Sequence, residues 1–215
     1  MSHLLADQTY QTLRQQIIAG IYRPSQRLVE SDLAQSLGVS RISVRSALQR
    51  LHQEGLVTLQ PHRGASVTDI TLEQALQIME VRQGLEGWAG ALAARRITDD
   101  EAEELARIAA LMEEMLDLGR HLEYSEANAL FHQRIISAAR NARLQQSIDS
   151  LQTSLVRYRF RAIMVPNRGA GSRREHSQIL EAIRARSPER AEAAMREHIE
   201  SVAKAMVDAR RFMEF

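Results

Sequence analysis

Three histidines in the C-terminal half have the chemistry and the spacing of a metal site. His132, His176 and His198 lie 44 and 22 residues apart, so each falls on a different predicted helix. Asn128 precedes His132 by four residues and shares its helix face. Imidazole nitrogens and an amide oxygen from neighbouring helices can hold a divalent ion inside a helical bundle. For any single histidine, filling or capping its own helix independently is the simpler interpretation.

The absence of cysteine narrows the ligands that such a site can use. The 215-residue sequence contains no cysteine, which excludes disulfides and thiolate metal ligands. A metal would therefore be held by histidine, carboxylate, amide or water. Three histidines with an open coordination position could also activate water, but no convincing general acid, general base or nucleophile motif accompanies them.

Arginines near the N-terminus form a second group suited to chemistry. Through Ser66 the chain has seven arginines, no lysine and four acidic residues, which gives a charge of about +3. The net charge of the whole chain is +1, so the remainder is slightly acidic. Arginine suits bidentate contacts to phosphate or guanine. Because Lys204 is the only lysine, a general bias of the genome towards arginine explains the pattern equally well.

The elements that would position these arginines follow one another in a characteristic order. Apolar spacing and breakers predict helices over 7–19, 30–37 and 41–53, with Gly38 in the short turn between the last two. Two short β runs, 56–59 and 65–67, follow and are joined by a hairpin tip at 60–64. Helix, helix, turn, helix and hairpin is the order of a winged helix-turn-helix.

The helix predicted after Ser40 has an apolar face and a polar face. The apolar residues, which should pack on the core, are Val44, Leu48 and Leu51. The polar residues on a different face are Arg41, Arg45, Gln49 and His52. A recognition helix presents its N-terminal residues to the major groove, and these are Arg41, Ile42 and Ser43. We expect Arg41 to recognise guanine through two hydrogen bonds.

Other basic residues would position the DNA rather than specify its sequence. Arg45 and Arg50 lie further along the helix and could contact phosphates. Arg63 and Gly64 at the hairpin tip could enter the minor groove, because glycine lets the backbone approach closely and arginine favours narrow grooves. Taken alone, these arginines fit a solvated helix face equally well; their order along the chain favours DNA.

The rest of the chain is predicted to be an all-helical bundle. Six helices are expected over 71–96, 98–118, 121–140, 142–164, 172–186 and 188–211. The fold is therefore expected to be mainly α, with an N-terminal winged helix-turn-helix over 1–70 and a six-helix domain over 71–215. No signal peptide or membrane-length apolar run is recognisable, so we expect a cytoplasmic protein without a membrane partner.

Residues 28–67 closely resemble the DNA-binding domain of GntR-family repressors. The matching stretches include LVESDLAQSLGVSRISVRSAL and PHRGASV. The resemblance implies that Arg41, Arg45, Arg63 and Gly64 contact a palindromic operator, and that the protein is a homodimer. Ser43 replaces the usual proline of the pattern, and Ser31 stands where many members carry an arginine that touches the operator.

Residues 71–211 resemble the FCD ligand-binding domain of the FadR subfamily. The motifs that carry the resemblance are Glu80-Val81-Arg82-x3-Glu86, Asn128-x2-Phe131-His132, Glu175-His176 and Met195-x2-His198. The resemblance implies a divalent metal (zinc, nickel or manganese) on His132, His176, His198 and the residue at position 128. Most such members carry aspartate where this chain has Asn128, so the site would have one more positive charge.

The resemblance also implies an effector above the metal. Arg82 would pair with the carboxylate of a small organic acid and would itself be held by Glu86. Weaker candidates for the pocket are Tyr124, Arg157, Tyr158 and Arg161. The expected function is a repressor whose operator affinity depends on this acid. The alternatives are a helical metal-dependent hydrolase or lyase fused to a DNA-binding head, and a dimeric DNA-binding protein without an effector.

Overall fold

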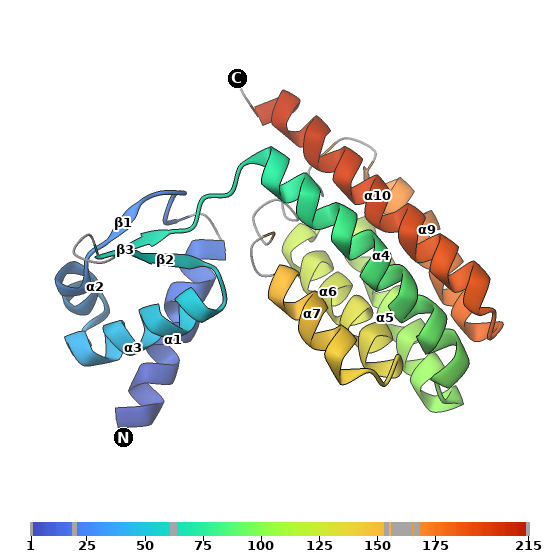
Figure 1. Cartoon of the computed structure of the whole chain (residues 1–215), viewed down its shortest axis with the longest axis horizontal. Helices are drawn as coiled ribbons and strands as arrows, with labels where there is room; N and C mark the ends of the chain where they lie inside the picture. The colour runs from blue at the N-terminus through green and yellow to red at the C-terminus, as the bar shows by residue number, and fades with distance from the viewer. Residues whose placement is uncertain are drawn as a thin grey trace. The chain divides into compact units, whose positions relative to one another are not determined.

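A computed structural model gives the fold of residues 2–18, 21–60, 64–152, 155, 165 and 168–213. The chain forms two compact units, and the division in the sequence falls after Thr71 (Figure 1). We call the first the N-terminal head and the second the helical unit. The mainly helical fold with a small sheet confirms the predicted fold class.

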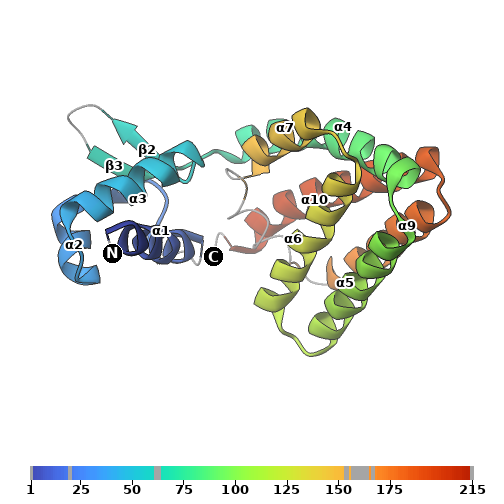
Figure 2. The ribbon, with the colours of Figure 1, turned by 90° about the horizontal axis from the view of Figure 1, so that it is seen from below.

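The N-terminal head combines three helices with a small antiparallel sheet (Figure 2). Its elements are α1 (Ser2–Ile18), β1 (Arg27–Leu28), α2 (Glu30–Leu37), α3 (Arg41–Gln53), β2 (Val57–Gln60) and β3 (Gly64–Val67). The strand order is β1-β3-β2. Strand β1 falls between the helices predicted over 7–19 and 30–37 and was not predicted, because two residues are too few to show an alternating pattern.

A shared core and a tight turn connect α2 and α3. Leu13 of α1, Leu33 of α2 and Leu48 of α3 are buried in one cluster with the inner faces of the strands. Gly38 adopts a left-handed backbone with φ 64° and ends α2, a conformation that glycine adopts without steric cost. Ser40 then caps α3 by accepting a hydrogen bond from the backbone N–H of Ser43.

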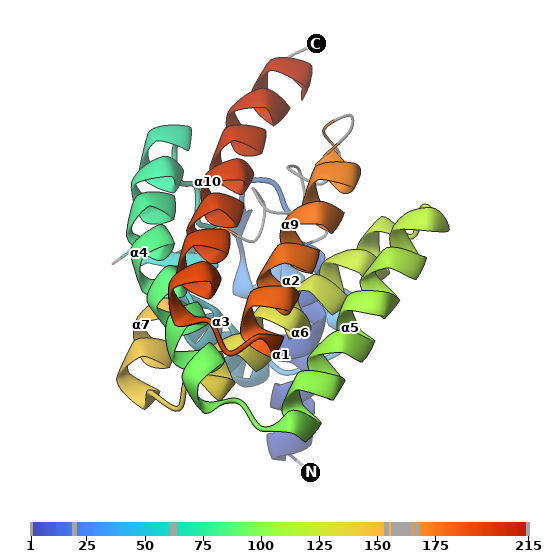
Figure 3. The same ribbon diagram turned by 90° about the vertical axis from the view of Figure 1, so that its right-hand side faces the viewer.

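The helical unit is a bundle of antiparallel neighbours (Figure 3). Its described helices are α4 (Leu72–Arg96), α5 (Asp99–Asp117), α6 (His121–Ala138), α7 (Ala142–Gln152), α9 (Arg168–Arg184) and α10 (Pro188–Met213). Helix α10 packs along α4 and α9, and α5 packs along α6. None of the helices in the described ranges has the apolar run that crossing a membrane requires.

Small residues bring α4 and α10 into close contact. A Cβ atom added at Gly90 would lie 3.0 Å from the backbone oxygen of Ala191, and Ala89, Ala93 and Ala94 of α4 are fully buried. The backbones can approach because no larger side chain separates them. As a result, polar side chains further along the two helices can reach a common interior.

The start of α9 differs from the prediction. The stretch 167–171 was expected to be a loop, yet residues from Arg168 onward are helical. Arg168 forms a two-point ion pair with Glu175, two turns further along the same helix, and Gly169 packs closely against Leu116 of α5. The ion pair within α9 and the contact with α5 together outweigh the low helix propensity of glycine. The helix expected over 142–164 is observed as α7 to Gln152, and most of its remainder lies outside the described residues.

Candidate metal centre and nucleic-acid interface

Three histidines meet in the interior of the helical unit. His132 comes from α6, His176 from α9 and His198 from α10, and their candidate ligand atoms all lie within 4.8 Å of one another. All three side chains are buried. The rings of His132 and His198 are stacked, with centroids 5.0 Å apart. Residues far apart in the sequence thus form one cluster, as their spacing predicted.

His198 is oriented by a carboxylate on the neighbouring helix. Its Nδ1 lies 2.7 Å from Oε2 of Glu175, which orients Nε2 away from this carboxylate. Glu175 also accepts a hydrogen bond from the Ser201 hydroxyl of α10 and two from the Arg168 guanidinium. Such carboxylate–histidine pairs fix the tautomer of a ligand and make it more basic.

His132 faces a second buried carboxylate, Glu86 of α4. Its Nδ1 lies 3.3 Å from Oε2 of Glu86, an ion-pair distance without the alignment of a hydrogen bond. The guanidinium of Arg82 donates from Nε to Oε1 of Glu86 at 2.7 Å. The pairing of Arg82 with Glu86, expected from their i,i+4 spacing, is therefore present. Both His132 and His198 thus face a glutamate that is itself paired with an arginine of its own helix.

His176 is held by hydroxyl groups instead of a carboxylate. Its Nδ1 lies 3.4 Å from the Ser172 hydroxyl, which is 2.6 Å from the Tyr124 hydroxyl. Phe131 packs its ring at a steep angle against the His176 ring. The Nε2 atom of His176 is buried and makes no hydrogen bond within the described part of the chain. A buried nitrogen without a partner is costly, and a metal ion would satisfy it.

The arginines keep both carboxylates ionised. Burial raises the pKa of Glu86, but the charge of Arg82 and the nearby His132 ring outweigh this and hold it well below its usual range. Burial also raises the pKa of Glu175, but hydrogen bonds from His198 and Ser201 and the Arg168 charge lower it to about 2. Both groups therefore accept hydrogen bonds as carboxylates at neutral pH.

Burial keeps two of the histidines neutral. It lowers the pKa of His176 far below the usual value, and the proximity of His198 and His132 lowers it further. Burial also lowers the pKa of His198, to about 4, although the hydrogen bond to Glu175 opposes this shift. A neutral imidazole has a lone pair available for a metal ion, so these rings are in the state that a ligand requires.

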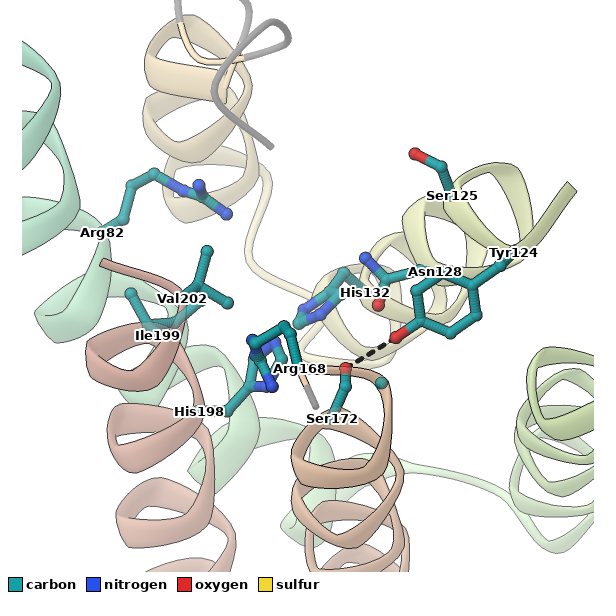
Figure 4. A pocket seen from close by; sticks show the side chains of 11 residues that line it. Arg82, Tyr124, Ser125, Asn128, His132, Arg168, Ser172, His198, Ile199 and Val202 are labelled. Atoms are coloured by element: carbon teal, nitrogen blue, oxygen red, sulfur yellow. Dashed lines mark hydrogen bonds between the residues drawn. The ribbon is translucent and has the colours of Figure 1, made fainter. Parts of the chain in front are cut away.

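Asn128 supplies the fourth candidate ligand. Its Oδ1 atom is buried and has no hydrogen-bond partner among the described residues. Asn128, His132 and His198 line a common pocket with about 590 Å³ of empty space (Figure 4). An unpartnered amide oxygen in the pocket that His132 and His198 line adds an oxygen donor to the three imidazoles, a combination that suits a divalent ion. The residues present therefore fit the metal that the sequence resemblance implies.

The pocket includes predicted residues and residues that the sequence analysis missed. Arg82 and Tyr124 line it as expected, but Arg157, Tyr158 and Arg161 lie outside the described residues. The additional lining residues are Ser125, Arg168, Gly169, Ser172, Ile199 and Val202. Arg168 was missed because its helix was predicted to begin only at Ser172. Glu175 was noted only as the neighbour of His176, whereas its side chain contacts His198.

The first turn of α3 presents two side chains outward in the N-terminal head. Arg41 is exposed, and no ion pair or hydrogen bond of its side chain is observed within the described residues. Ile42 is 80% exposed. Ser43 points inward, is 8% exposed and lies 2.9 Å from the Ser40 hydroxyl. The structure therefore does not place Ser43 on the outer face, where a base contact was expected, because its hydroxyl belongs to the helix cap.

Two other arginines of α3 have partners. Arg45 is exposed and forms a two-point ion pair with Glu30 of α2. This hydrogen bond lowers the pKa of Glu30. Arg50 instead pairs with Asp7 of α1 at 2.7 Å and stacks over the Tyr10 ring. The structure brings Arg45 to the face of Arg41 but turns Arg50 towards α1, so it does not group all three expected DNA contacts.

The hairpin ends at a backbone conformation that favours glycine. Gly64 begins β3 with φ 83° and faces open space at its Cα, as a turn that approaches another molecule closely would require. Strands β2 and β3 pair from Val57–Val67 to Gln60–Gly64. Arg63, expected beside Gly64, lies outside the described residues.

Comparison with known proteins covers both units. Residues 5–67 match the gntR family of bacterial regulatory proteins, and residues 77–201 match the FCD domain. The chain is 31% identical to the uncharacterized HTH-type transcriptional regulator BphR of Paraburkholderia xenovorans, over 92% of this chain and 83% of that protein. It is 30% identical to the probable D-xylose utilization operon transcriptional repressor of Paenarthrobacter nicotinovorans, over 79% and 74% respectively.

Solved structures share the fold. Escherichia coli McbR/YncC superposes with a TM-score of 0.81 at 23% identity, covering 95% of this chain and 97% of that one. A putative GntR regulator from Rhodococcus gives 0.75 at 23% identity, covering 94% and 97%. Both relatives and the Rhodococcus structure are named as transcriptional regulators or repressors. The chain belongs to the GntR family of bacterial regulatory proteins and carries an FCD domain in its C-terminal half.

Proposed function

We propose that the protein is a transcriptional repressor in which a small carboxylate, bound at the metal centre of the helical unit, controls operator affinity. The observation that carries this proposal is the buried cluster of three histidines with the unpartnered Asn128 oxygen, open to a pocket. The sign of regulation is proposed because two relatives are named repressors, that of Paenarthrobacter and RspR of Escherichia coli. Such a regulator would act on the chromosome in the cytoplasm.

The N-terminal head would place α3 in the major groove. Arg41 is available to donate two hydrogen bonds to guanine, because no hydrogen bond or ion pair holds its guanidinium in the described head and only the charge of Glu30 attracts it from a distance. Arg45 would position the DNA by exchanging its exposed ion pair with Glu30 for a phosphate. Gly64 would let the hairpin approach the backbone, with Arg63 beside it in the minor groove.

Replacing Arg41 should abolish recognition of one base pair. We expect Arg41→Ala to weaken binding to a selected operator by about tenfold to hundredfold and to remove the preference for guanine at one position. Arg27→Ala, which removes an exposed charge from β1, should lower affinity evenly over all sequences if it lowers it at all. Fluorescence anisotropy with single-base operator variants distinguishes the two. Retained guanine preference in Arg41→Ala would contradict this assignment.

His132, His176, His198 and Asn128 would hold a divalent ion, with zinc, nickel or manganese as the candidates. A bound ion would supply open coordination positions for an oxygen of the effector. Around it, Arg82 and Arg168 line the pocket while each pairs with a glutamate. Arginine has five N–H donors, so either guanidinium can keep its glutamate and still donate to an effector carboxylate.

Effector control can be tested on the intact protein. Metal content of the purified protein is measured first, and operator affinity is then titrated with a panel of carboxylates and sugar acids. We expect at least one acid to lower operator affinity, and chelation of the metal to remove that response, because the acid and the metal share the pocket. An operator affinity that stays constant over the whole panel with metal present would argue for a DNA-binding protein without an effector.

Asn128 would set the charge of the centre. Three neutral imidazoles, a neutral amide and a divalent ion give +2, whereas aspartate at position 128 would give +1. The missing negative charge should weaken the metal and strengthen attraction for an anion.

The variant Asn128→Asp should therefore bind metal about tenfold more tightly and bind a carboxylate effector several-fold more weakly. Competition with a chromophoric chelator measures the first quantity, and calorimetry measures the second. Ser125→Ala, which alters a pocket side chain outside the proposed ligand set, is the matched control and should leave the metal affinity unchanged. If both affinities are the same in Asn128→Asp and in the parent, the charge argument fails.

Glu175 would act as a positioning residue for His198. In Glu175→Gln the acceptor of the His198 Nδ1–H bond becomes a neutral amide, so the imidazole should be a weaker ligand. We expect metal affinity to fall by about tenfold to hundredfold with the helical content retained. Glu181→Gln removes an exposed carboxylate from the same helix and should have no effect. Equal metal affinity in both variants would exclude the positioning role.

The homodimer also remains a proposal, supported by an apolar stripe on α4. Val81 and Trp88, separated by two helical turns, are 53% and 44% exposed. Gly84 lies between them and leaves open space beside the helix. A second copy of the chain would cover this stripe, and two-fold symmetry would match a palindromic operator.

A further inference from the structure

Ile42 is an apolar side chain that the fold of the head does not need. At 80% exposure it is the most exposed large hydrophobic residue in the described part of the chain. Its neighbours Ser43 and Val44 turn inward, so Ile42 contributes nothing to the core. It also does not favour the helix locally, because β-branched residues have low helix propensity and acidic residues suit a first turn better.

The surroundings of Ile42 point to DNA as its partner. Arg41 precedes it and Arg45 follows it by three residues, and both are exposed. Ser46 and Gln49 lie one and two turns further along the same face of α3. Ser46 is partly exposed and Gln49 is exposed. An apolar side chain between two arginines suits a partner with phosphates on its rim and an apolar group between them.

We propose that Ile42 specifies a thymine by packing against its C5-methyl group, in the base pair beside the guanine contacted by Arg41. Thymine is the only base of unmodified DNA with a methyl group in the major groove, and apolar side chains recognise it by contact. Isoleucine cannot donate or accept a hydrogen bond, so the other three bases offer it nothing equivalent. The proposal rests on DNA binding through α3, as set out above.

Replacing thymine by deoxyuridine removes only the methyl group and leaves base pairing unchanged. Binding sites for the full-length protein are first selected from random duplex DNA, and each thymine of the half-site is then replaced in turn. We expect one deoxyuridine to weaken binding by about fourfold, which is the affinity expected from burying one methyl-sized group. When cytosine stands at that position instead of thymine, the methyl group is also missing. Replacing this cytosine by 5-methylcytosine should then restore part of the affinity.

Protein variants tie the effect to one side chain. In Ile42→Ala, thymine and deoxyuridine operators should bind equally, and the fold should be retained because the side chain is exposed. Ile21→Ala is the matched control: Ile21 is 65% exposed in the same head but precedes β1, and its variant should keep the fourfold difference. Light scattering in the absence of DNA should show the parent mass for both variants.

The outcomes separate this inference from the proposed function. If the selected operator binds but no thymine shows the methyl effect, or if Ile42→Ala retains it, the inference is overturned. A change in oligomeric mass in Ile42→Ala without loss of the methyl effect would assign Ile42 to a protein contact. If no duplex is enriched at all, DNA binding itself fails and the inference fails with it.

Discussion

Two carboxylates, one buried and one partly exposed, order the interior of the helical unit, and each depends on an arginine from its own helix. Glu86 is fully buried on α4 with Arg82 one turn away, and Glu175 lies on α9 with Arg168 two turns away. An unpaired carboxylate at such depth would cost several kcal/mol. Because each charge is balanced within one helix, the remaining acceptor capacity is free to reach across to another helix.

The contacts that the two glutamates make with other helices position His132 and His198. Glu86 faces His132 of α6, and Glu175 accepts from His198 and Ser201 of α10. Polar contacts thereby join α4 to α6 and α9 to α10 around the histidine cluster, and the hydrogen bonds of Glu175 have a direction that hydrophobic packing alone cannot provide. The same contacts orient Nδ1 of both rings towards the carboxylates. The metal centre and the bundle packing therefore depend on the same pair of ion pairs.

The sequence predicted the histidine cluster through the resemblance to the FCD domain, since spacing alone only placed each histidine on a different helix. It also predicted the Arg82–Glu86 pair, since both residues lie on one helix with i,i+4 spacing. The predicted start of α9 was wrong, because the glycines before Ser172 suggested a loop, whereas a contact with Leu116 of α5 favours a helix. Tertiary partners of this kind leave no periodic signal in the chain.

The lack of a sequence signal for tertiary contacts also explains why Arg50 does not lie with the other expected DNA contacts. Its sequence position beside the polar face suggested a phosphate contact, but Asp7 and Tyr10 of α1 hold it elsewhere. Ser43 was misassigned for a related reason, since the cap at Ser40 draws its side chain inward. Within one helix the sequence predicts which residues share a face, but the packing of α1 decides which of them are available.

Arginine has opposite roles in the two units, and this difference bears on how DNA recognition is divided. In the helical unit, Arg82 is buried and Arg168 is half-buried, and glutamates balance both charges. In the head, Arg45 forms an ion pair with the half-exposed Glu30, whereas Arg41 forms no ion pair in the described chain and feels the charge of Glu30 only from a distance. Binding DNA through Arg45 requires an existing ion pair to be exchanged, so its net gain is reduced. Arg41 incurs no such exchange, and base recognition should therefore depend more strongly on Arg41 than on Arg45.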